Sequence, residues 1–177
     1  MLKIIVIGVL ITFLAIFAFT TIDPNVSPGN NGTNTQLVSE QYTSVTVTGQ
    51  VNKPGTYVLE DGATIDDLLL AAGGPTSNAD ANAYIETTAL KKGKSYYIAP
   101  LYDESDICGD KMLEKVNINY DGKDKLMSVN GFGSAIVTAI INYRDQNGSF
   151  TYLEELKEVS GIGNATFEKV KNSITLR

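Results

Sequence analysis

The stretches best suited to chemistry are two short glycine turns, residues 129–135 (VNGFGSA) and 159–165 (VSGIGNA), which lie thirty positions apart. Each turn places an apolar residue between two glycines. Glycine adopts positive φ without a side-chain clash, so each turn can form a sharp corner between two helices. The first amides of the helix after such a corner have no partner within that helix and lie at the positive end of its dipole. Each corner therefore predicts a cup of backbone N–H groups that suits an anion such as phosphate.

The two corners belong to an internal repeat. At an offset of thirty, seven pairs of positions agree: Leu126 with Leu156, Val129 with Val159, Gly131 with Gly161, Gly133 with Gly163, Ala135 with Ala165, Val137 with Phe167 and Ile140 with Val170. Each unit is expected to contain a short helix, a glycine turn and a longer helix. The longer helices are predicted at about residues 134–146 and 164–174. Two identical cups side by side suit a ligand that repeats its own charges.

Local polar residues predict where the short leading helices begin. Asp121 with Asp124 is expected to open the first one, and Thr151 with Glu154 forms a capping-box pattern for the second.

The candidate phosphate-binding residues are those of the two corners, together with one nearby lysine: Gly131, Phe132, Gly133, Ser134, Ala135, Gly161, Ile162, Gly163, Asn164, Ala165 and Lys169. Phe132 and Ile162, between the glycines, are expected to plug each corner into the core. Neither corner contains a lysine or arginine. The donors are therefore expected to be main-chain amides, and phosphate contacts of that kind carry no base identity.

The composition excludes most catalytic chemistry. Histidine and tryptophan are absent and there is one cysteine, which removes histidine-based acid–base catalysis and most transition-metal sites. No phosphate loop ending in Gly-Lys-Ser/Thr is present, and the scattered carboxylates read as solvated. No enzyme activity, catalytic residue, metal or cofactor is expected. Cys108 has no internal disulfide partner, so an intermolecular bridge and an idle thiol both remain open.

Charge is unevenly distributed along the chain, whose net charge is −6. Residues 1–113 carry 6 basic and 12 acidic side chains, whereas residues 114–177 carry 8 of each. The part with the corners is therefore neutral, and it can still bind phosphate if its donors are backbone groups.

The amino-terminal segment predicts a membrane anchor at residues 1–22. The uncharged run of residues 4–22 would make a helix of about 28 Å, close to the hydrocarbon thickness of a bilayer. Lys3 favours a cytoplasmic amino terminus, with everything from Asp23 onward outside the cytoplasm. A cleaved signal peptide is the alternative. Residues 23–41, rich in Asn, Gly, Pro, Ser and Thr, predict a flexible stalk.

Residues 42–100 predict a first folded module, a small α+β unit. Val45 and Val47 alternate with threonines, as is typical of a strand. A turn at residues 53–55 leads to a second strand, and Thr64 can cap a helix that glycines end at residues 73–74. Residues 96–99 supply a late strand, and residues 101–115 read as a linker.

The turn residues of this module resemble those of the SLBB (soluble-ligand-binding β-grasp) domain. They are Gly49-x-Val51-x-x-Pro54-Gly55, then Ala72-Gly73-Gly74, and then Gly93-x-x-Tyr96-x-Ile98-x-Pro100. The resemblance implies binding of small ligands, saccharide chains or other copies of the same domain.

Residues 116–177 resemble the tandem helix-hairpin-helix domain. They contain Val116-Asn117-Ile118-Asn119, Ile141-Asn142-Tyr143-Arg144 and Gly148-Ser149-Phe150 around the two corners. The complete order is similar to that of the ComEA-like family of competence DNA receptors. This resemblance implies a membrane-held receptor for double-stranded DNA, with self-association through the SLBB domain and DNA-uptake channel components as partners. Members of that family often carry lysine just beyond the hairpin glycines, where this chain has other residues.

The sequence thus predicts an α+β protein: an amino-terminal transmembrane helix, a β-grasp-like SLBB domain and a small all-α tandem helix-hairpin-helix domain. The alternative function is a cell-surface saccharide-binding or scaffold protein in which the hairpins are only structural.

Overall fold

The computed structural model describes residues 41–103 and 112–177. The expected anchor and nearly all of the expected stalk lie outside these residues. In the described part of the chain, no helix has the length and apolar character needed to cross a bilayer. The described residues form one compact unit.

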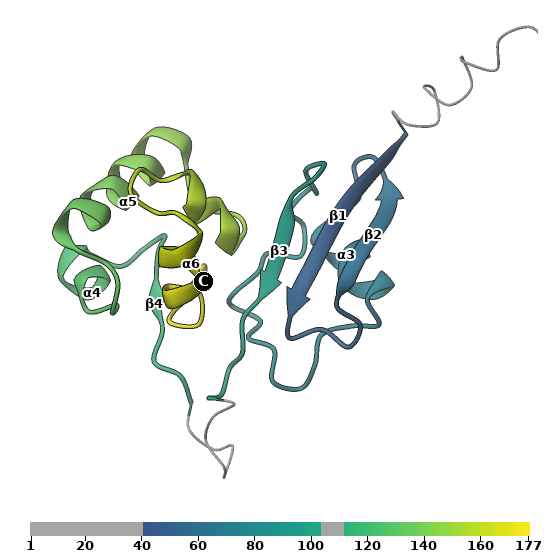
Figure 1. Ribbon diagram of the computed structural model, residues 1–177, viewed down its shortest axis with the longest axis horizontal. Helices are drawn as coiled ribbons and strands as arrows, with labels where there is room; N and C mark the ends of the chain where they lie inside the picture. The colour runs from purple at the N-terminus through teal and green to yellow at the C-terminus, as the bar shows by residue number, and fades with distance from the viewer. Residues whose placement is uncertain (1–40, 104–111) are drawn as a thin grey trace, which may run out of the picture. The chain divides into compact units, whose positions relative to one another are not determined.

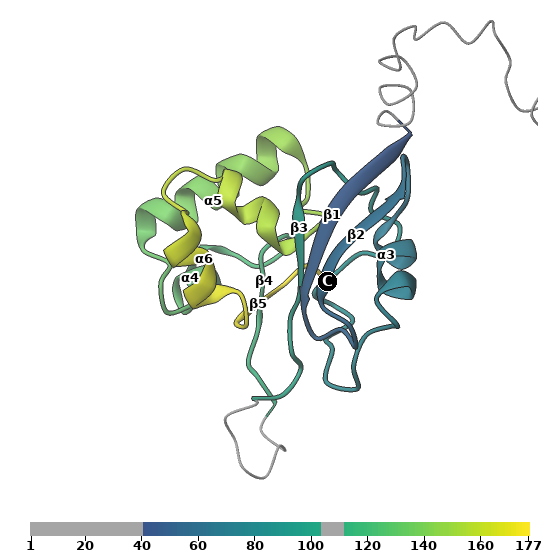
Figure 2. The same cartoon turned by 45° about the vertical axis from the view of Figure 1, so that its right-hand side comes forward.

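The first module is built on a three-stranded sheet with the order β2-β1-β3 (Figure 1). The central strand β1 (Tyr42–Gly49) is antiparallel to β2 (Gly55–Glu60) and parallel to β3 (Ser95–Ile98). Helix α3 (Ile65–Ala71) lies against one face of the sheet (Figure 2). Val45 and Val47 are buried, so the alternating pattern of the sequence correctly identified the inner face.

The ends of α3 confirm the expected local signals. The Thr64 side chain accepts a hydrogen bond from the Asp67 amide, and the Asp67 carboxylate accepts one from the Thr64 amide in return. Gly73 and Gly74 follow the helix with φ of 78° and 87°, which favours glycine at both positions. This capped amino terminus offers a comparison for the helices of the second module.

The second module contains two helical repeats. The first consists of α4 (Lys123–Met127) and α5 (Ser134–Asn147), and the second of the 3₁₀ helix η1 (Leu153–Glu158) and α6 (Asn164–Val170). Their buried side chains form one continuous apolar core.

The expectation that this module is all-α was wrong. A short parallel pair, β4 (Val116–Asn117) and β5 (Ile174–Thr175), joins its two ends. Helix α6 therefore ends at Val170, short of the expected residue 174, because the chain must extend to reach β4.

The two leading helices begin differently from the prediction. Gly122, and not Asp121, is the N-cap of α4, while the Asp121 carboxylate accepts a hydrogen bond from the Asn117 amide at 2.7 Å. At η1, Glu155 takes the position predicted for Glu154: its Oε2 accepts hydrogen bonds from the Thr151 amide at 2.8 Å and the Thr151 hydroxyl at 3.1 Å. The helix begins one residue later than the pattern indicates, with Tyr152 as its N-cap, and Glu154 is buried instead.

The polar motifs around the repeats hold the fold together. The Asn119 side-chain amide donates to the carbonyls of Phe150 and Leu176, both at 3.0 Å, and its oxygen accepts from the Phe150 amide at 2.7 Å. Arg144 donates to the Ile118 and Asp121 carbonyls, each at 3.0 Å. Because these side chains are used internally, the resemblance they carry concerns folding rather than ligand contact.

Buried polar contacts join the two modules within this unit. Lys115 Nζ lies 2.7 Å from Asp80 Oδ2, and both side chains are buried. Desolvation lowers the pKa of Lys115, although its bond to Asp80 acts in the opposite direction. The Arg177 guanidinium donates to the Ala81 and Tyr84 carbonyls. Because desolvation offsets much of the attraction between Lys115 and Asp80, this pair fixes how the modules join rather than adding much net stability.

Candidate nucleic-acid interface

The first glycine of each corner supplies the unusual backbone angle. Gly131 and Gly161 have φ of 125° and 90°. Gly133 and Gly163 have φ of −83° and −94° and serve as the N-caps of α5 and α6. Positive φ therefore does not explain the second glycine of each corner, because an N-cap residue has an ordinary extended backbone.

The first glycines also allow the two repeats to approach each other closely. A Cβ atom on Gly131 would lie 3.0 Å from Val170 Cγ1 and 3.3 Å from Lys169 Cδ, both on α6. A Cβ atom on Gly161 would lie 3.5 Å from Ile136 Cγ1 on α5. Each corner thus packs against the longer helix of the other repeat. Gly131 is needed for this packing whether or not a ligand is bound, whereas a Cβ on Gly161 would make an ordinary contact and its positive φ is what favours glycine.

The second glycines, in contrast, face open space. Both are exposed, and a Cβ atom on Gly133 or Gly163 would meet nothing within 4 Å. A ligand atom can therefore approach the amino termini of α5 and α6 without meeting a side chain from the N-cap position.

The amino termini of α5 and α6 are uncapped. Neither has a side-chain cap or an acidic residue in its first turn. The amides of Val137 and Phe167 donate to the carbonyls of Gly133 and Gly163, so the amides at positions 134–136 and 164–166 precede the helical bonding pattern. Helix α3, by comparison, has a capping box and two acidic residues at its amino terminus. The difference leaves unneutralised positive dipole ends at both corners.

The predicted site residues differ in exposure: two are buried, Gly131 is half-buried and eight are exposed. Phe132 and Ile162 are buried, with 5% and 3% of their surface exposed. Their side chains fix the corners from inside, as expected, and cannot themselves reach a ligand. The exposed members are Gly133, Ser134, Ala135, Gly161, Gly163, Asn164, Ala165 and Lys169.

Lys169 belongs to the second repeat in sequence, but its side chain lies beside the first corner. Its Cδ and Cε lie 3.3 Å and 3.8 Å from the place of a Cβ on Gly131. The side chain is exposed, so its ammonium group is available near the first corner. Sequence spacing alone could not reveal this, because the crossing depends on how the two repeats pack.

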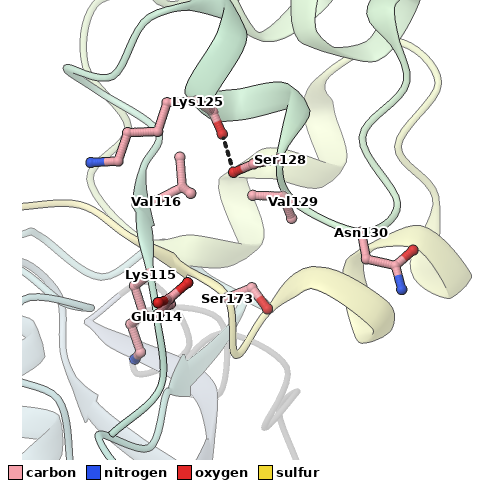
Figure 3. A pocket seen from close by; sticks show the side chains of 8 residues that line it. All are labelled: Glu114, Lys115, Val116, Lys125, Ser128, Val129, Asn130 and Ser173. Atoms are coloured by element: carbon pink, nitrogen blue, oxygen red, sulfur yellow. Dashed lines mark hydrogen bonds between the residues drawn. The ribbon is translucent and has the colours of Figure 1, made fainter.

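A cavity of about 490 Å³ lies beside the first corner (Figure 3). Its lining is Glu114, Lys115, Val116, Lys125, Ser128, Val129, Asn130 and Ser173. The Ser128 hydroxyl donates to the Lys125 carbonyl at 2.7 Å, as the dashed line in Figure 3 shows. Lys125 pairs with Asp121 at 3.0 Å, and Lys115 pairs with Asp80. With both lysines paired and Glu114 beside them, the cavity has no excess of positive charge to hold a phosphate.

Comparisons with known proteins agree with the two modules. Residues 44–99 match the SLBB domain, and residues 112–175 match the helix-hairpin-helix motif. The chain is 31% identical over 148 residues to ComE operon protein 1 of Bacillus subtilis (strain 168), covering 78% of this chain and 72% of that protein.

Two shorter similarities involve proteins that the chain matches over less of their length. An uncharacterized protein of Haemophilus influenzae is 36% identical over 72 residues, which is 40% of this chain and 64% of that protein. The human endonuclease/exonuclease/phosphatase family domain-containing protein 1 is 38% identical over 61 residues, only 11% of its length.

The fold and the paired corners define a protein that joins an SLBB domain to a tandem helix-hairpin-helix domain. The similarity to ComE operon protein 1 covers 78% of the chain, more than either module alone. The chain belongs to the ComEA-like family, of which ComE operon protein 1 is a member.

Proposed function

We propose that this chain is a membrane-anchored, extracytoplasmic receptor that binds double-stranded DNA without sequence preference during competence and DNA uptake. Membership of the ComEA-like family supports the role. The observation that carries the mechanism is the pair of uncapped, acid-free helix amino termini behind exposed glycines. The proposal describes a binding protein and assigns no catalytic step.

In the proposed mechanism, main-chain amides bind the DNA backbone. Amides at positions 134–136 and 164–166 donate to phosphate oxygens, and the helix dipoles favour the negative charge. Lys169 adds a cation at the first corner, while Phe132 and Ile162 hold the corners in shape. Since no contact reaches a base edge, affinity depends on the charge and spacing of the phosphates rather than on sequence.

Anchoring and self-association complete the proposal. An anchor at residues 1–22 would hold many copies at one surface, so that weak individual sites act together through avidity. Self-association through the SLBB module is supported by β2, an edge strand of its sheet that carries Val58 with 66% of its surface exposed. Components of a DNA-uptake channel are the proposed onward partners.

A salt titration tests this function. The full-length chain in mild detergent is expected to bind two unrelated duplexes of equal length with equal affinity. If four phosphates are engaged, log K should fall against log salt with a slope of about −4 or shallower. Fluorescence anisotropy over a range of salt concentrations measures both quantities. A large difference between the duplexes, or no binding at low salt, would contradict the proposal.

A further inference from the structure

The turn at residues 91–94 (KKGK) of the SLBB module is a concentrated basic feature. It holds three of the chain's 14 lysines and arginines, and all four of its residues are exposed. Hydrogen bonds fix its shape: the Gly93 amide donates to the Ser44 carbonyl at 2.8 Å, and the Lys94 amide donates to the Lys91 carbonyl at 3.1 Å. Gly93 has a φ of 73°, which glycine adopts without strain. The turn therefore presents its lysines from a defined backbone.

This turn contacts the segment that leads into the second corner. Lys94 Nζ lies 3.0 Å from Glu158 Oε1, at the end of η1. Lys91 Nζ lies 5.4 Å from the centroid of the Tyr152 ring, at the start of η1. Glu158 stands three positions before Gly161 in the sequence. The basic turn is thus attached to the second helix-hairpin-helix repeat rather than to its own module alone.

The charges explain why such a contact matters. Residues 159–165 of the second corner contain no basic residue, and Glu158 directly before them would repel a phosphate. Lys94 neutralises this carboxylate, and its hydrogen bond is the main reason that the pKa of Glu158 lies below its usual value. The first corner receives its cation from Lys169 of the other repeat. Near the second corner, Lys157 of η1 holds its Nζ 4.5 Å from the centroid of the Phe167 ring, and the SLBB turn brings further lysines to the same helix.

We propose that the turn at residues 91–94 is a further phosphate-binding element, which binds the DNA backbone beside the second corner. The inference rests on the proposed DNA-binding function and adds a role for the SLBB module in it. Lys94 removes the repulsion of Glu158, while Lys91 and Lys92 provide charge for the phosphates next to those held by the corner. Each lysine that contacts a phosphate releases counterions, so it contributes to the salt dependence of binding.

An anionic membrane surface is the other array of phosphate groups that a basic turn could bind. The bond between Lys94 and Glu158 favours DNA, because it ties the turn to the approach of the second corner. Vesicles of phosphatidylglycerol and phosphatidylcholine provide the competing ligand in the experiment below.

Single neutral substitutions test the proposal in the full-length chain. Lys91→Gln and Lys92→Gln are each expected to weaken duplex binding several-fold at about 0.1 M salt and to reduce the salt slope by about 1. Lys53→Gln is the matched control, with the same charge change in the same module. Lys53 follows the carboxyl end of β1, whereas the basic turn is bonded to Ser44 near its beginning. The control is expected to leave affinity and slope unchanged.

A second pair of variants tests the role of Lys94. Lys94→Gln should weaken DNA binding by exposing the charge of Glu158, and adding Glu158→Gln should restore much of the loss. Circular dichroism confirms that each variant is folded.

The outcomes separate this inference from the function on which it rests. If the unaltered chain binds duplex and the turn variants behave like Lys53→Gln, the basic turn is not a DNA contact and this inference fails alone. If the turn variants lose binding to vesicles but bind DNA unchanged, the inference is likewise overturned, in favour of a membrane role for the turn. If the unaltered chain does not bind duplex at all, the proposed function itself fails.

Discussion

Replacing both Ala135 and Ala165 by glutamate is expected to reduce DNA affinity on the order of 100-fold while the protein remains folded. Both alanines are exposed in the first turns of α5 and α6. A carboxylate there interacts favourably with the helix dipole and stabilises each helix by about 0.3–1 kcal/mol. The same carboxylate competes with phosphate for the amides and repels it. Binding and stability should therefore change in opposite directions.

The neutral double variant, Ala135→Gln with Ala165→Gln, is the control for side-chain size. It should retain most of the affinity, because it adds bulk without charge at these exposed positions. Anisotropy titration measures binding, and thermal melting measures stability. If the glutamate variant loses affinity only together with its fold, or if glutamine has the same effect, the amino termini of the helices are not the anion sites.

Replacing Glu154 by glutamine is expected to remove a pH dependence of stability. Glu154 is 8% exposed, and its Oε2 is buried without a hydrogen-bond partner. Burial raises its pKa from 4.5 to about 7, against smaller opposing effects that include the charges of Lys157 and Lys171. The unfolded chain therefore releases this proton at lower pH than the folded chain does. The free energy of unfolding is therefore higher below pH 4.5 and falls as pH rises through about 7. The full shift corresponds to a loss of about 3 kcal/mol.

Chemical unfolding at pH 5 and pH 8 measures this effect. The unaltered chain should be less stable at pH 8, and Glu154→Gln should remove most of that difference. The neighbouring Glu155→Gln is a useful comparison, because Glu155 is only half-buried and accepts hydrogen bonds from Thr151. Equal pH dependence in the unaltered chain and in Glu154→Gln would show that Glu154 is ionised in the folded protein.

The sequence predicted most of the framework because its signals are local. The alternation of Val45 and Val47, the Thr64 capping box and the repeated glycines each specify a conformation within a few residues. The family resemblance is likewise carried by short motifs. Two of their residues, Asn119 and Arg144, donate hydrogen bonds to backbone carbonyls within the fold.

The remaining features depend on contacts between distant residues. The β4–β5 pair joins residues 116 and 174, and the approach of Lys169 to Gly131 requires the packing of two repeats. The different roles of the glycines within one corner also emerge only in three dimensions. Gly131 meets α6, whereas Gly133 faces open space, although both belong to the same Gly-x-Gly pattern. Glu154 is buried in η1, whose N-cap is Tyr152 rather than the Thr151 that the capping-box pattern indicated.

The most direct test of the account is an NMR titration of the ¹⁵N-labelled full-length chain with duplex DNA. If main-chain amides at the two corners bind phosphate, the amide protons of residues 134–136 and 164–166 should show the largest downfield shifts, and these should disappear at high salt. Unchanged signals from these six amides at saturating DNA, with shifts confined to other surfaces, would contradict the central claim.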